Sequence, residues 1–521
     1  MDNFTLTVVL MSIATLIYLL HRRKTSIPAT HLPPSPPKLP IIGHLHLLTN
    51  MPHRAFSRLA DQFGPIFYLQ LGQVPTVVVS AAQPAELVLK AHDHVFSNRP
   101  QLVAAQYLSF GCSDVTFSKY GPYWRQARKI CVTELLSPKR VNSFEVIRDE
   151  EVTPLLHVVS TRSGLEVDIS ALFFHLANDM LCRVAFGKRF LQEQSRGNEE
   201  KDLNRILSET QALLAGFCIG DFFPEWEWVN SVSGMRRRLM KNLKELREVC
   251  DDIINEHMKT RKESTSGDGD ARKEDFVDVL LRVQRQHDLE VPITDDNLKA
   301  LVLDMFVAGT DTTSATLEWV MTELSRHPEV MKKAQDEIRD MAETKGEIEE
   351  TELHHFRYLK AVIKETMRLH PPVPLLVPRE SMQKCTLQGY DIPERTRILI
   401  NTYAIGRDPN SWPNPMVYDP ERFVETEVDF RGQDFRFLPF GGGRRGCPGY
   451  AFGLATIELT LARLLYHFDW KLPPGTGPDD VDLDEIFGLA TRKKTALKLI
   501  PTENRNYGLK KDGPRVSPNA T

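Results

Sequence analysis

Ten residues near the C-terminus, Phe440 to Gly449 with the sequence FGGGRRGCPG, restrict the fold of this chain more than any other stretch. Five of the ten are glycines, so the backbone can adopt positive φ and can lie close to a flat ligand. Arg444 and Arg445 add fixed positive charge, which suits carboxylates on such a ligand. A proline follows Cys447, and we expect a helix from Pro448 to Asp469. The amides at the start of that helix would favour the thiolate form of the cysteine.

A thiolate held by such a loop beneath a planar, acid-bearing ligand suggests a haem iron site. Thiolate ligation pushes electron density onto the iron and favours cleavage of dioxygen. The alternative is a glycine-rich turn that holds a buried, unreactive cysteine. The remaining cysteines stand singly, without CxxC pairs or zinc spacing, which predicts unpaired thiols in a reducing compartment. They are Cys112, Cys131, Cys182, Cys218, Cys250 and Cys385.

The stretch resembles the haem-binding loop of the cytochrome P450 family, Phe-x-x-Gly-x-Arg-x-Cys-x-Gly. The fixed positions of that pattern are here Phe440, Gly443, Arg445, Cys447 and Gly449. The resemblance implies that these residues bind haem b, with Cys447 as the axial ligand of the iron. It also implies a mainly α-helical fold with small β-sheets. The amino-acid sequence around these positions is similar to that of plant microsomal members of the family, in the large plant-specific A-type clan.

Trp124 and Arg128 are four residues apart in the segment YWRQARKI, which places them on one face of a helix. The indole N–H and the guanidinium group can both donate hydrogen bonds to a haem propionate. A surface helix with a half-buried tryptophan is the alternative. The family has a Trp-x-x-x-Arg helix, and the resemblance implies that both residues bind the cofactor.

The segment AGTDTT, residues 308–313, lies in a long apolar helix that we expect to begin near Asn297. Gly309 weakens a helix, and threonine hydroxyls can bond back to carbonyls and bend it. A local opening would leave a groove for dioxygen. A polar helix N-cap in a Ser/Thr-rich turn is the alternative. The segment resembles the family's oxygen-activation motif, which implies that Asp311 and Thr312 deliver protons.

Glu365 and Arg368 are three residues apart in KETMRLHPP and share a helix face. An isolated pair of this kind is a surface salt bridge that contributes little. Residues 420–423, PERF, precede the cysteine loop. The resemblance to the family implies a buried network of Glu365, Arg368 and Arg422 that is structural and not catalytic.

Leu6 to Leu20 are almost wholly apolar, and the basic run His21 to Lys24 follows at once. About 17 apolar residues just span a bilayer core, and a basic flank after the span places the remaining chain in the cytosol. A cleaved signal peptide is the alternative, but it requires positive charge before the apolar run. We therefore expect a single-pass endoplasmic reticulum anchor at 1–24, a proline-rich hinge at 25–43, a catalytic domain at 44–501 and a polar tail at 502–521.

Short β-prone runs at Phe67–Leu71 and Thr76–Ser80, separated by Gly72 and Pro75, predict a small hairpin. Helical periodicity predicts further helices at 138–152, 240–261 and 328–345, with Ser137 as the N-cap of the first. Residues 263–274 are polar and glycine-bearing, and predict an exposed linker.

The resemblance implies an NADPH- and O2-dependent monooxygenase that acts on a lipophilic plant specialised metabolite. The chain has no flavin or nucleotide fingerprint, so electrons would come from a partner, NADPH–cytochrome P450 reductase. A net charge of −4 gives no reason to expect nucleic-acid binding. We favour a terpenoid substrate, with a flavonoid or phenylpropanoid as the alternative. A reductase-independent isomerase or dehydratase and a non-catalytic haem carrier also stay open.

The substrate pocket implied by the resemblance is apolar, which predicts a lipophilic ligand. Each of its residues is as compatible with plain core packing as with a pocket wall. They are Phe110, Phe222, Val307, Ala308, Leu375, Leu376, Phe487 and Leu489.

Overall fold

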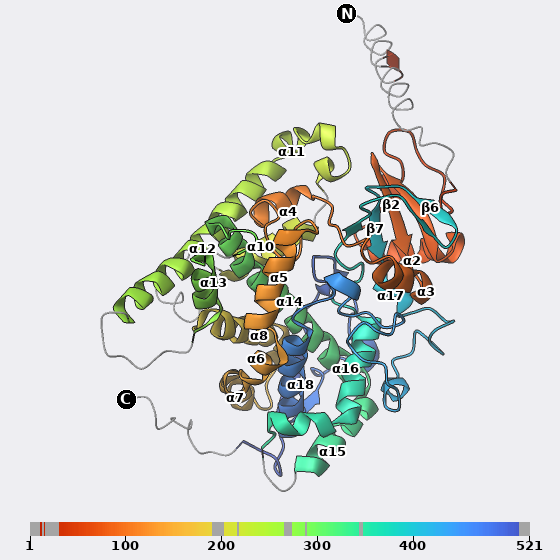
Figure 1. The fold of residues 1–521 in the computed structure, drawn as a ribbon. Coiled ribbons are helices and arrows are strands. Elements are labelled where there is room, and N and C mark those ends of the chain that lie inside the picture. The colour runs from red at the N-terminus through yellow and green to blue at the C-terminus, as the bar shows by residue number, and fades with distance from the viewer. Residues whose placement is uncertain are drawn as a thin grey trace, which may run out of the picture.

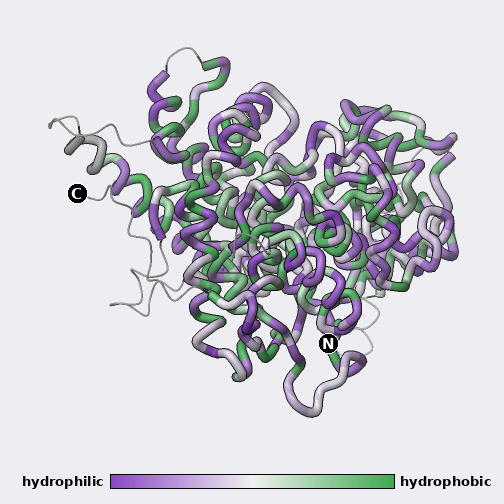
Figure 2. The backbone as a smooth tube through the Cα atoms, turned by 90° about the horizontal axis from the view of Figure 1, so that it is seen from below, coloured by the Kyte–Doolittle hydropathy of each residue, from purple (hydrophilic) through white to green (hydrophobic). Residues whose placement is uncertain are grey.

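The computed structural model describes residues 11, 12, 15, 31–189, 203–215, 218–264, 274–286, 289–342 and 347–509. Most of this part of the chain is helical, and a smaller region of strands lies to one side of the helices (Figure 1). The predicted fold class, mainly α with small β-sheets, is confirmed. Hydrophobic and hydrophilic residues alternate along the outer helices (Figure 2), as expected for helices with one buried face.

The centre of the helical region is α14 (Asp295–Arg326), which packs against α8 (Ile169–Phe186), α16 (Arg357–Leu369) and α18 (Tyr450–His467). A capping box begins α14, because the Thr294 hydroxyl accepts from the Asn297 N–H and the Asn297 side chain accepts from the Thr294 N–H. Most side chains of α14 are buried, so this helix forms core on nearly all sides.

The other helices are α2 (Pro52–Phe63), α3 (Ala82–Glu86), α4 (Val103–Leu108), α5 (Pro122–Glu134), α6 (Pro138–Asn142), α7 (Glu145–Thr161), α10 (Leu203–Ala215), α11 (Val229–Val232), α12 (Met235–Ser264), α13 (Phe276–Gln284), α15 (Pro328–Ala342) and α17 (Thr402–Ile405). Of these, α2, α3 and α17 lie beside the large sheet, and the rest lie in the helical region with α14 (Figure 1).

The largest sheet has the strand order β1-β2-β7-β4, with β1 (Ile66–Leu71), β2 (Val74–Val79), β7 (Arg397–Ile400) and β4 (Arg379–Glu380). The hairpin β1–β2 is antiparallel, β2 and β7 are parallel, and β4 is antiparallel to β7. Three smaller sheets pair β8 (Phe468–Lys471) and β3 (Val167–Asp168) with β11 (Lys498–Glu503), β5 (Cys385–Leu387) with β6 (Tyr390–Ile392), and β9 (Glu485–Ile486) with β10 (Arg492–Lys493).

The elements differ from the sequence predictions mainly at their ends. The hairpin is where we expected it, and Ser137 caps α6 by accepting from the Arg140 N–H. The single helix predicted at 138–152 is instead two, α6 and α7, because Phe144 turns inward between them and packs edge-to-face on Phe452. The helix after the cysteine begins at Tyr450, two residues later than predicted.

Residues 31–43, predicted as part of a spacer between anchor and catalytic domain, lie against the large sheet. The carbonyl of Pro34 accepts from the Tyr68 N–H at 2.8 Å, and Gly43 forms β-bridges with Leu39 and Leu71. A Cβ on Gly43 would lie 2.1 Å from the Gln70 carbonyl, so this contact requires glycine. Residues 31–43 of the predicted hinge are therefore packed on the domain that contains the large sheet.

Within the described residues, α8 is the one helix long and apolar enough to cross a membrane, and most of it is buried inside the protein. It packs on α14 and α7, which is the position of a core helix. The predicted anchor at 1–24 lies outside the described residues, apart from Met11, Ser12 and Thr15. The anchor and the predicted tail boundary at 502–521 stay predictions.

Glu365, Arg368 and Arg422 form a buried network that joins α16 to the segment before the cysteine loop. Arg368 donates to both oxygens of Glu365 at 2.6 and 2.7 Å, and Arg422 donates to Glu365 at 3.0 Å. Arg368 also donates to the carbonyl of Pro415 at 2.7 Å. The Asp419 N–H donates to Glu365 at 2.8 Å, so one carboxylate organises both the arginines and the backbone.

We expect Glu365→Ala to lower the free energy of unfolding by about 3–5 kcal/mol, because it leaves buried arginines without their carboxylate. Unfolding in urea, followed by the helical circular dichroism signal, measures the loss. Glu86→Ala is the control, since it removes only the exposed Lys90–Glu86 pair, worth about 0.5 kcal/mol. Equal losses in both variants would contradict a central role for the network.

Candidate active site

A cavity of about 260 Å³ lies between α14 and the cysteine loop. Ala308, Gly309, Thr312 and Thr313 line it from α14, and the loop contributes Phe440 to Gly442, Arg445 and Cys447 to Gly449. The structure thus brings the two strongest sequence motifs, which are far apart in the chain, to the walls of one cavity.

Glycine is required at specific positions of the loop. Gly441 and Gly443 have φ of 68° and 66°, in the left-handed region that other residues rarely adopt. A Cβ on Gly443 would lie 2.3 Å from the Leu89 carbonyl oxygen, so a side chain has no room there. The Cys447 N–H donates to the Phe440 carbonyl at 2.9 Å and closes the loop.

Asp93 holds the loop from outside the cavity. Its carboxylate accepts from the Arg444 N–H and from the Arg379 guanidinium, each at 2.9 Å. Arg379 in turn donates to the Gly442 carbonyl at 2.8 Å. Asp93 and Arg379 are both buried, so these bonds are shielded from water. The loop position is therefore set by tertiary contacts as well as by its own glycines.

The side chain of Cys447 is exposed although it lies deep in the protein, because it borders the cavity. Burial raises the pKa of the Cys447 thiol, while the Gly449 N–H and the charge of Arg128 act in the opposite direction. The start of α18 thus favours the thiolate, as predicted, but burial outweighs it in the polypeptide alone. A coordinating metal ion deprotonates a thiol outright.

Positive charge is concentrated around this cavity. Arg99, Arg379 and Arg445 are buried and Arg128 is partly buried, and all four line the cavity. Burial lowers the pKa of each, and for Arg445 burial together with the nearby Arg379 and Arg128 lowers the pKa to about 9. An anionic ligand would relieve this repulsion.

Three of these arginines have no carboxylate within ion-pair distance among the described residues. Arg99 donates to the carbonyls of Thr116, Val377 and Pro378. Arg445 donates to the carbonyls of Ser97, Val115 and Ser118, at 2.8, 3.2 and 2.7 Å. Arg128 donates to the Gly446 carbonyl at 2.7 Å. The residues present therefore fit haem, whose propionates supply the missing negative charge and whose iron suits a cysteine ligand.

Trp124 is buried on α5, but it does not line the cavity. Its indole N–H donates to the Val115 carbonyl at 3.0 Å, and the Arg445 guanidinium lies 4.1 Å from its ring centroid. In this structure Trp124 supports Arg445 from behind, through a cation–π contact, whereas Arg128 faces the cavity. The sequence pattern predicted a direct bond from both residues to the cofactor and could not separate these positions.

The helix α14 is continuous through residues 308–313, so the predicted opening is not an interruption of the helix. The Thr312 hydroxyl donates to the Ala308 carbonyl at 2.7 Å, as expected for threonine in a helix. Ala308 is exposed towards the cavity. Gly309 lets α8 approach closely, because a Cβ there would lie 3.0 Å from the Leu181 side chain.

Asp311 is buried next to the cavity-lining Thr312 but does not itself line the cavity. Arg492 lies 3.8 Å from one of its oxygens, and the other oxygen has no hydrogen-bond partner among the described residues. Burial raises the pKa of Asp311, and Arg492 opposes this. A carboxyl group that keeps its proton more readily than usual is suited to proton delivery.

Asp304 is a cavity residue that the sequence analysis did not identify. It accepts from the Val115 N–H at 2.9 Å and from the Thr116 hydroxyl at 2.6 Å, which ties α14 to the loop that holds Arg445. Burial raises the pKa of Asp304, and the neighbouring Asp114 is affected in the same direction. An aspartate within the apolar run LVLDMF, one turn before Ala308, was the available signal.

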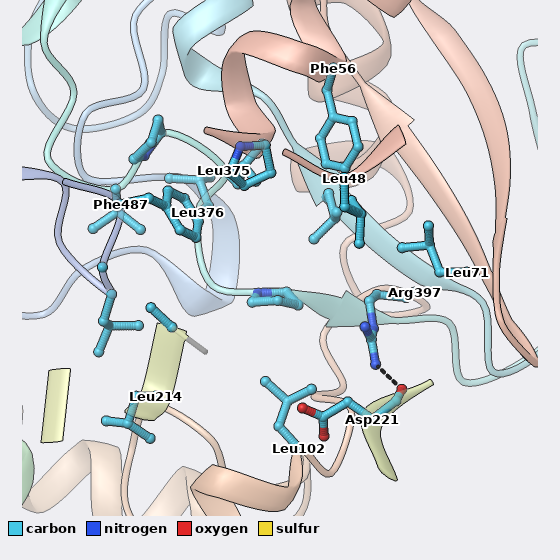
Figure 3. A pocket seen from close by; sticks show the side chains of 18 of the residues that line it. Leu48, Phe56, Leu71, Leu102, Leu214, Asp221, Leu375, Leu376, Arg397 and Phe487 are labelled. Atoms are coloured by element: carbon cyan, nitrogen blue, oxygen red, sulfur yellow. Dashed lines mark hydrogen bonds between the residues drawn. The ribbon is translucent and has the colours of Figure 1, made fainter. Parts of the chain in front are cut away.

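The predicted pocket residues occupy three environments. Val307, Ala308, Leu376 and Leu489 line the main cavity. Phe222, Leu375 and Phe487 line a second pocket next to it, together with Leu376 and Leu489 (Figure 3). Phe110 is buried outside both, where the Arg247 guanidinium lies 4.8 Å from its ring centroid.

Comparison with known proteins gives the family. The profile of the family described as "Cytochrome P450" matches residues 33–499. The chain belongs to the cytochrome P450 family. The matched range begins within the segment that docks on the large sheet.

Full-length relatives of this P450 are plant enzymes. It is 54% identical to "Tryptamine 5-hydroxylase" of Oryza sativa subsp. japonica over 518 residues, 98% of each chain. It is 43% identical to "Strychnine-11-hydroxylase" of Strychnos nux-vomica, over 94% of this chain and 95% of the relative. "Costunolide synthase" of Cichorium intybus is 42% identical, over 95% of this chain and 98% of the relative. The chain is thus a plant P450 monooxygenase whose relatives include hydroxylases of specialised metabolites.

Solved structures show the same fold. A zebrafish cytochrome P450 with abiraterone matches with a TM-score of 0.71 and 26% identity, covering 87% of this chain and 100% of that chain. A second structure, with progesterone, matches with a TM-score of 0.72 and 25% identity, covering 87% of this chain and 99% of that chain.

We expect Gly443→Ala to abolish stoichiometric haem binding, because the new methyl group meets the Leu89 carbonyl in a left-handed position. The haem-to-protein ratio of the purified variant measures this. Gly475→Ala is the matched control: it has φ of +86° but nothing within 4 Å, so it carries only the strain of about 1–2 kcal/mol. A Gly443→Ala protein with full haem content would show that the loop tolerates displacement.

Proposed function

We propose that this P450 is a haem-thiolate monooxygenase of the endoplasmic reticulum membrane, anchored by residues 1–24, that oxidises a lipophilic plant specialised metabolite. One observation carries the proposal: Cys447 and Thr312, from separate motifs, line the same cavity. A glycine-rich turn that only holds an unreactive cysteine does not account for a cavity rimmed by arginines between that cysteine and a threonine on the central helix. A non-catalytic haem carrier would not need the threonine.

Bound haem supplies dioxygen reduction and oxygen-atom transfer. Cys447 would ligate its iron, and Arg128 and Arg445 would hold its carboxylates. Thr312 faces the cavity and can turn its hydroxyl from the Ala308 carbonyl, so it would pass a proton to dioxygen that electrons from the partner have reduced. Asp311, buried and adjacent in sequence, holds the proton that replaces it.

Electrons come from NADPH through a separate reductase in this proposal. The side chain of Arg444 is 49% exposed, on the loop that carries Cys447. An exposed cationic side chain at this place suits a carboxylate on an electron-transfer partner. An isomerase or dehydratase would turn over without NADPH, which distinguishes it.

The membrane would supply the substrate. Trp228 is 65% exposed and Val232 is 78% exposed, in the segment beside the second pocket. Exposed tryptophan and aliphatic side chains together are typical of a membrane-interface contact. We propose that this segment and the anchor hold the pocket entrance at the bilayer surface.

Two substrate classes follow from different observations. Apolar walls favour a lipophile, and a terpenoid is the class that we proposed from the sequence. The relative at 54% identity is a tryptamine hydroxylase, so an arylalkylamine is the second class to test. Product analysis with NADPH, reductase and each class in turn decides between them.

The carbon-monoxide difference spectrum of the reduced protein tests the proposal directly. We expect a strongly red-shifted Soret band, as a thiolate ligand opposite carbon monoxide produces, and its loss in Cys447→Ala. Cys385→Ala is the control, because Cys385 lies on β5 and does not line the cavity. A red-shifted band that persists in Cys447→Ala would remove the ligand assignment and the proposed function with it.

Thr312→Ala tests proton delivery. We expect product formed per NADPH consumed to fall about ten-fold or more, with hydrogen peroxide released instead, because the hydroxyl that passes the proton is gone. The control is Thr322→Ala: Thr322 makes the same helical bond, to the Glu318 carbonyl at 2.7 Å, but is not on the cavity wall. Unchanged coupling in Thr312→Ala would exclude the threonine from proton transfer.

A further inference from the structure

The second pocket, of about 110 Å³, lies between the large sheet, α2 and the segment after α10 (Figure 3). Its walls are mostly apolar, and include Leu48, Phe56, Leu71, Leu102, Leu375 and Phe487. Leu214, Leu376 and Leu489 line both this pocket and the main cavity, so a long ligand can extend from one into the other.

Two charged side chains interrupt these apolar walls. Asp221 and Arg397 line the pocket, and each is only 9% exposed. Arg397 does not bond to the carboxylate: its Nη2 donates to the main-chain carbonyl of Asp221 at 3.1 Å (Figure 3). One carboxylate oxygen of Asp221 accepts from the Val103 N–H at 2.7 Å, at the start of α4.

These hydrogen bonds leave one or more polar atoms unpaired on both side chains. Within the part of the chain that the structure describes, Oδ2 of Asp221 and Nη1 of Arg397 have no hydrogen-bond partner. Nε of Arg397 is also buried without one. The surrounding leucines and phenylalanines offer no donor or acceptor. Buried polar atoms are nearly always paired, so the unpaired Nε of Arg397 is unusual. Together with the unused acceptor and donor that reach the pocket, it points to a ligand.

We propose that this pocket is a binding subsite for the head of a lipophilic molecule that carries one neutral hydroxyl or carboxamide group. Such a group can donate to Asp221 and accept from Arg397 at once. The inference rests on the proposed function, in that the apolar body of the ligand would extend into the main cavity. The inference adds to the proposed function the chemical class of the group by which the protein would hold the substrate.

The net charge of the pair favours a neutral head over an ion. Asp221 and Arg397 together carry no net charge, so a bound ammonium or carboxylate would bring a buried charge that only one of them offsets and the other repels. The burial that raises the pKa of Asp221 and lowers that of Arg397 shows how little either side chain is solvated. A neutral donor and acceptor satisfies both without adding charge.

A purely structural role explains only part of the arrangement. The Asp221 carbonyl accepts from Arg397 and its carboxylate accepts from the Val103 N–H, which fastens the segment after α10 to the sheet and to α4. The Gln73 N–H adds a bond to the Phe222 carbonyl at 2.8 Å. A clamp of this kind uses none of the atoms that remain unpaired. Oδ2 of Asp221 and Nη1 of Arg397 therefore remain available to a ligand.

Two isomers, n-hexanol and methyl pentyl ether, are matched probes, since only the alcohol can donate. Calorimetric titration of the haem-loaded full-length protein gives both dissociation constants. We expect the alcohol to bind about ten-fold more tightly than the ether, as for a hydrogen bond to a charged group. Hexanoate and hexyltrimethylammonium, the charged probes, should both bind more weakly than the alcohol. Tighter binding of either ion would overturn the neutral-head assignment.

Asp221→Asn should reduce the ratio between alcohol and ether to about one, because an amide NH2 replaces the free oxygen while the Val103 bond is kept. Leu48→Ala, on the apolar wall, should weaken both probes equally and leave the ratio unchanged. If Asp221→Asn does not retain haem, Arg397→Lys decides: it withdraws Nη1, so both isomers should bind several-fold more weakly.

An unchanged ratio in Asp221→Asn, or unchanged affinities in Arg397→Lys, would overturn the subsite. The carbon-monoxide spectrum of the same preparations separates this result from failure of the proposed function. A red-shifted band with an unchanged ratio removes the subsite alone, and a missing band in the unaltered protein removes the monooxygenase assignment.

Discussion

Positive charge that is buried beside a cavity without an ion-paired carboxylate is the constraint on which the active site depends. Arg128 and Arg445 donate to main-chain carbonyls alone, within the described residues, and the pKa of Arg445 is lowered to about 9. A carbonyl dipole compensates a buried cation only in part. An anionic cofactor between these arginines would supply the missing negative charge. Because haem would bind only the folded chain, its binding would stabilise the folded state by mass action.

The buried charges around Asp93 and Glu365 are instead paired with each other within the protein. Asp93 satisfies Arg379 and the backbone of the cysteine loop, and Glu365 satisfies Arg368 and Arg422. Each carboxylate is surrounded by its donors and faces no cavity. Arg379 lines the cavity but is paired with Asp93, whereas Arg99, Arg128 and Arg445 line it without a carboxylate partner among the described residues. Pairing within the protein, more than position beside the cavity, separates the structural arginines from those left for a ligand.

Short-range patterns in the sequence gave correct predictions for the positive φ of loop glycines, the β1–β2 hairpin and the Ser137 cap, which depend on residues whose chemistry is local. The glutamate–arginine network was expected only from the family resemblance, because Glu365 and Arg368 alone predicted a surface salt bridge and Arg422 is distant in sequence. The roles of Trp124 and Asp304 could not be predicted in the same way, because their partner is Val115, in a loop without a pattern of its own. Spacing along a helix identifies residues that share a face, but it does not identify the residues that this face contacts. Asp221 was missed for the same reason, since Arg397 is distant in sequence and comes from β7.

The two pockets differ in charge, and this difference limits how a substrate can lie. The main cavity is rimmed by arginines that a carboxylate-bearing cofactor occupies, so it offers the substrate mainly the apolar and hydroxyl surface of α14. The proposed subsite would add polar recognition by Asp221 and Arg397, which line the second pocket. A lipophile held there by its head would present to Thr312 whichever carbon lies one pocket length away. The position of oxidation would consequently depend on the distance from the head group more than on the intrinsic reactivity of each carbon, because geometry restricts which C–H bond reaches the haem.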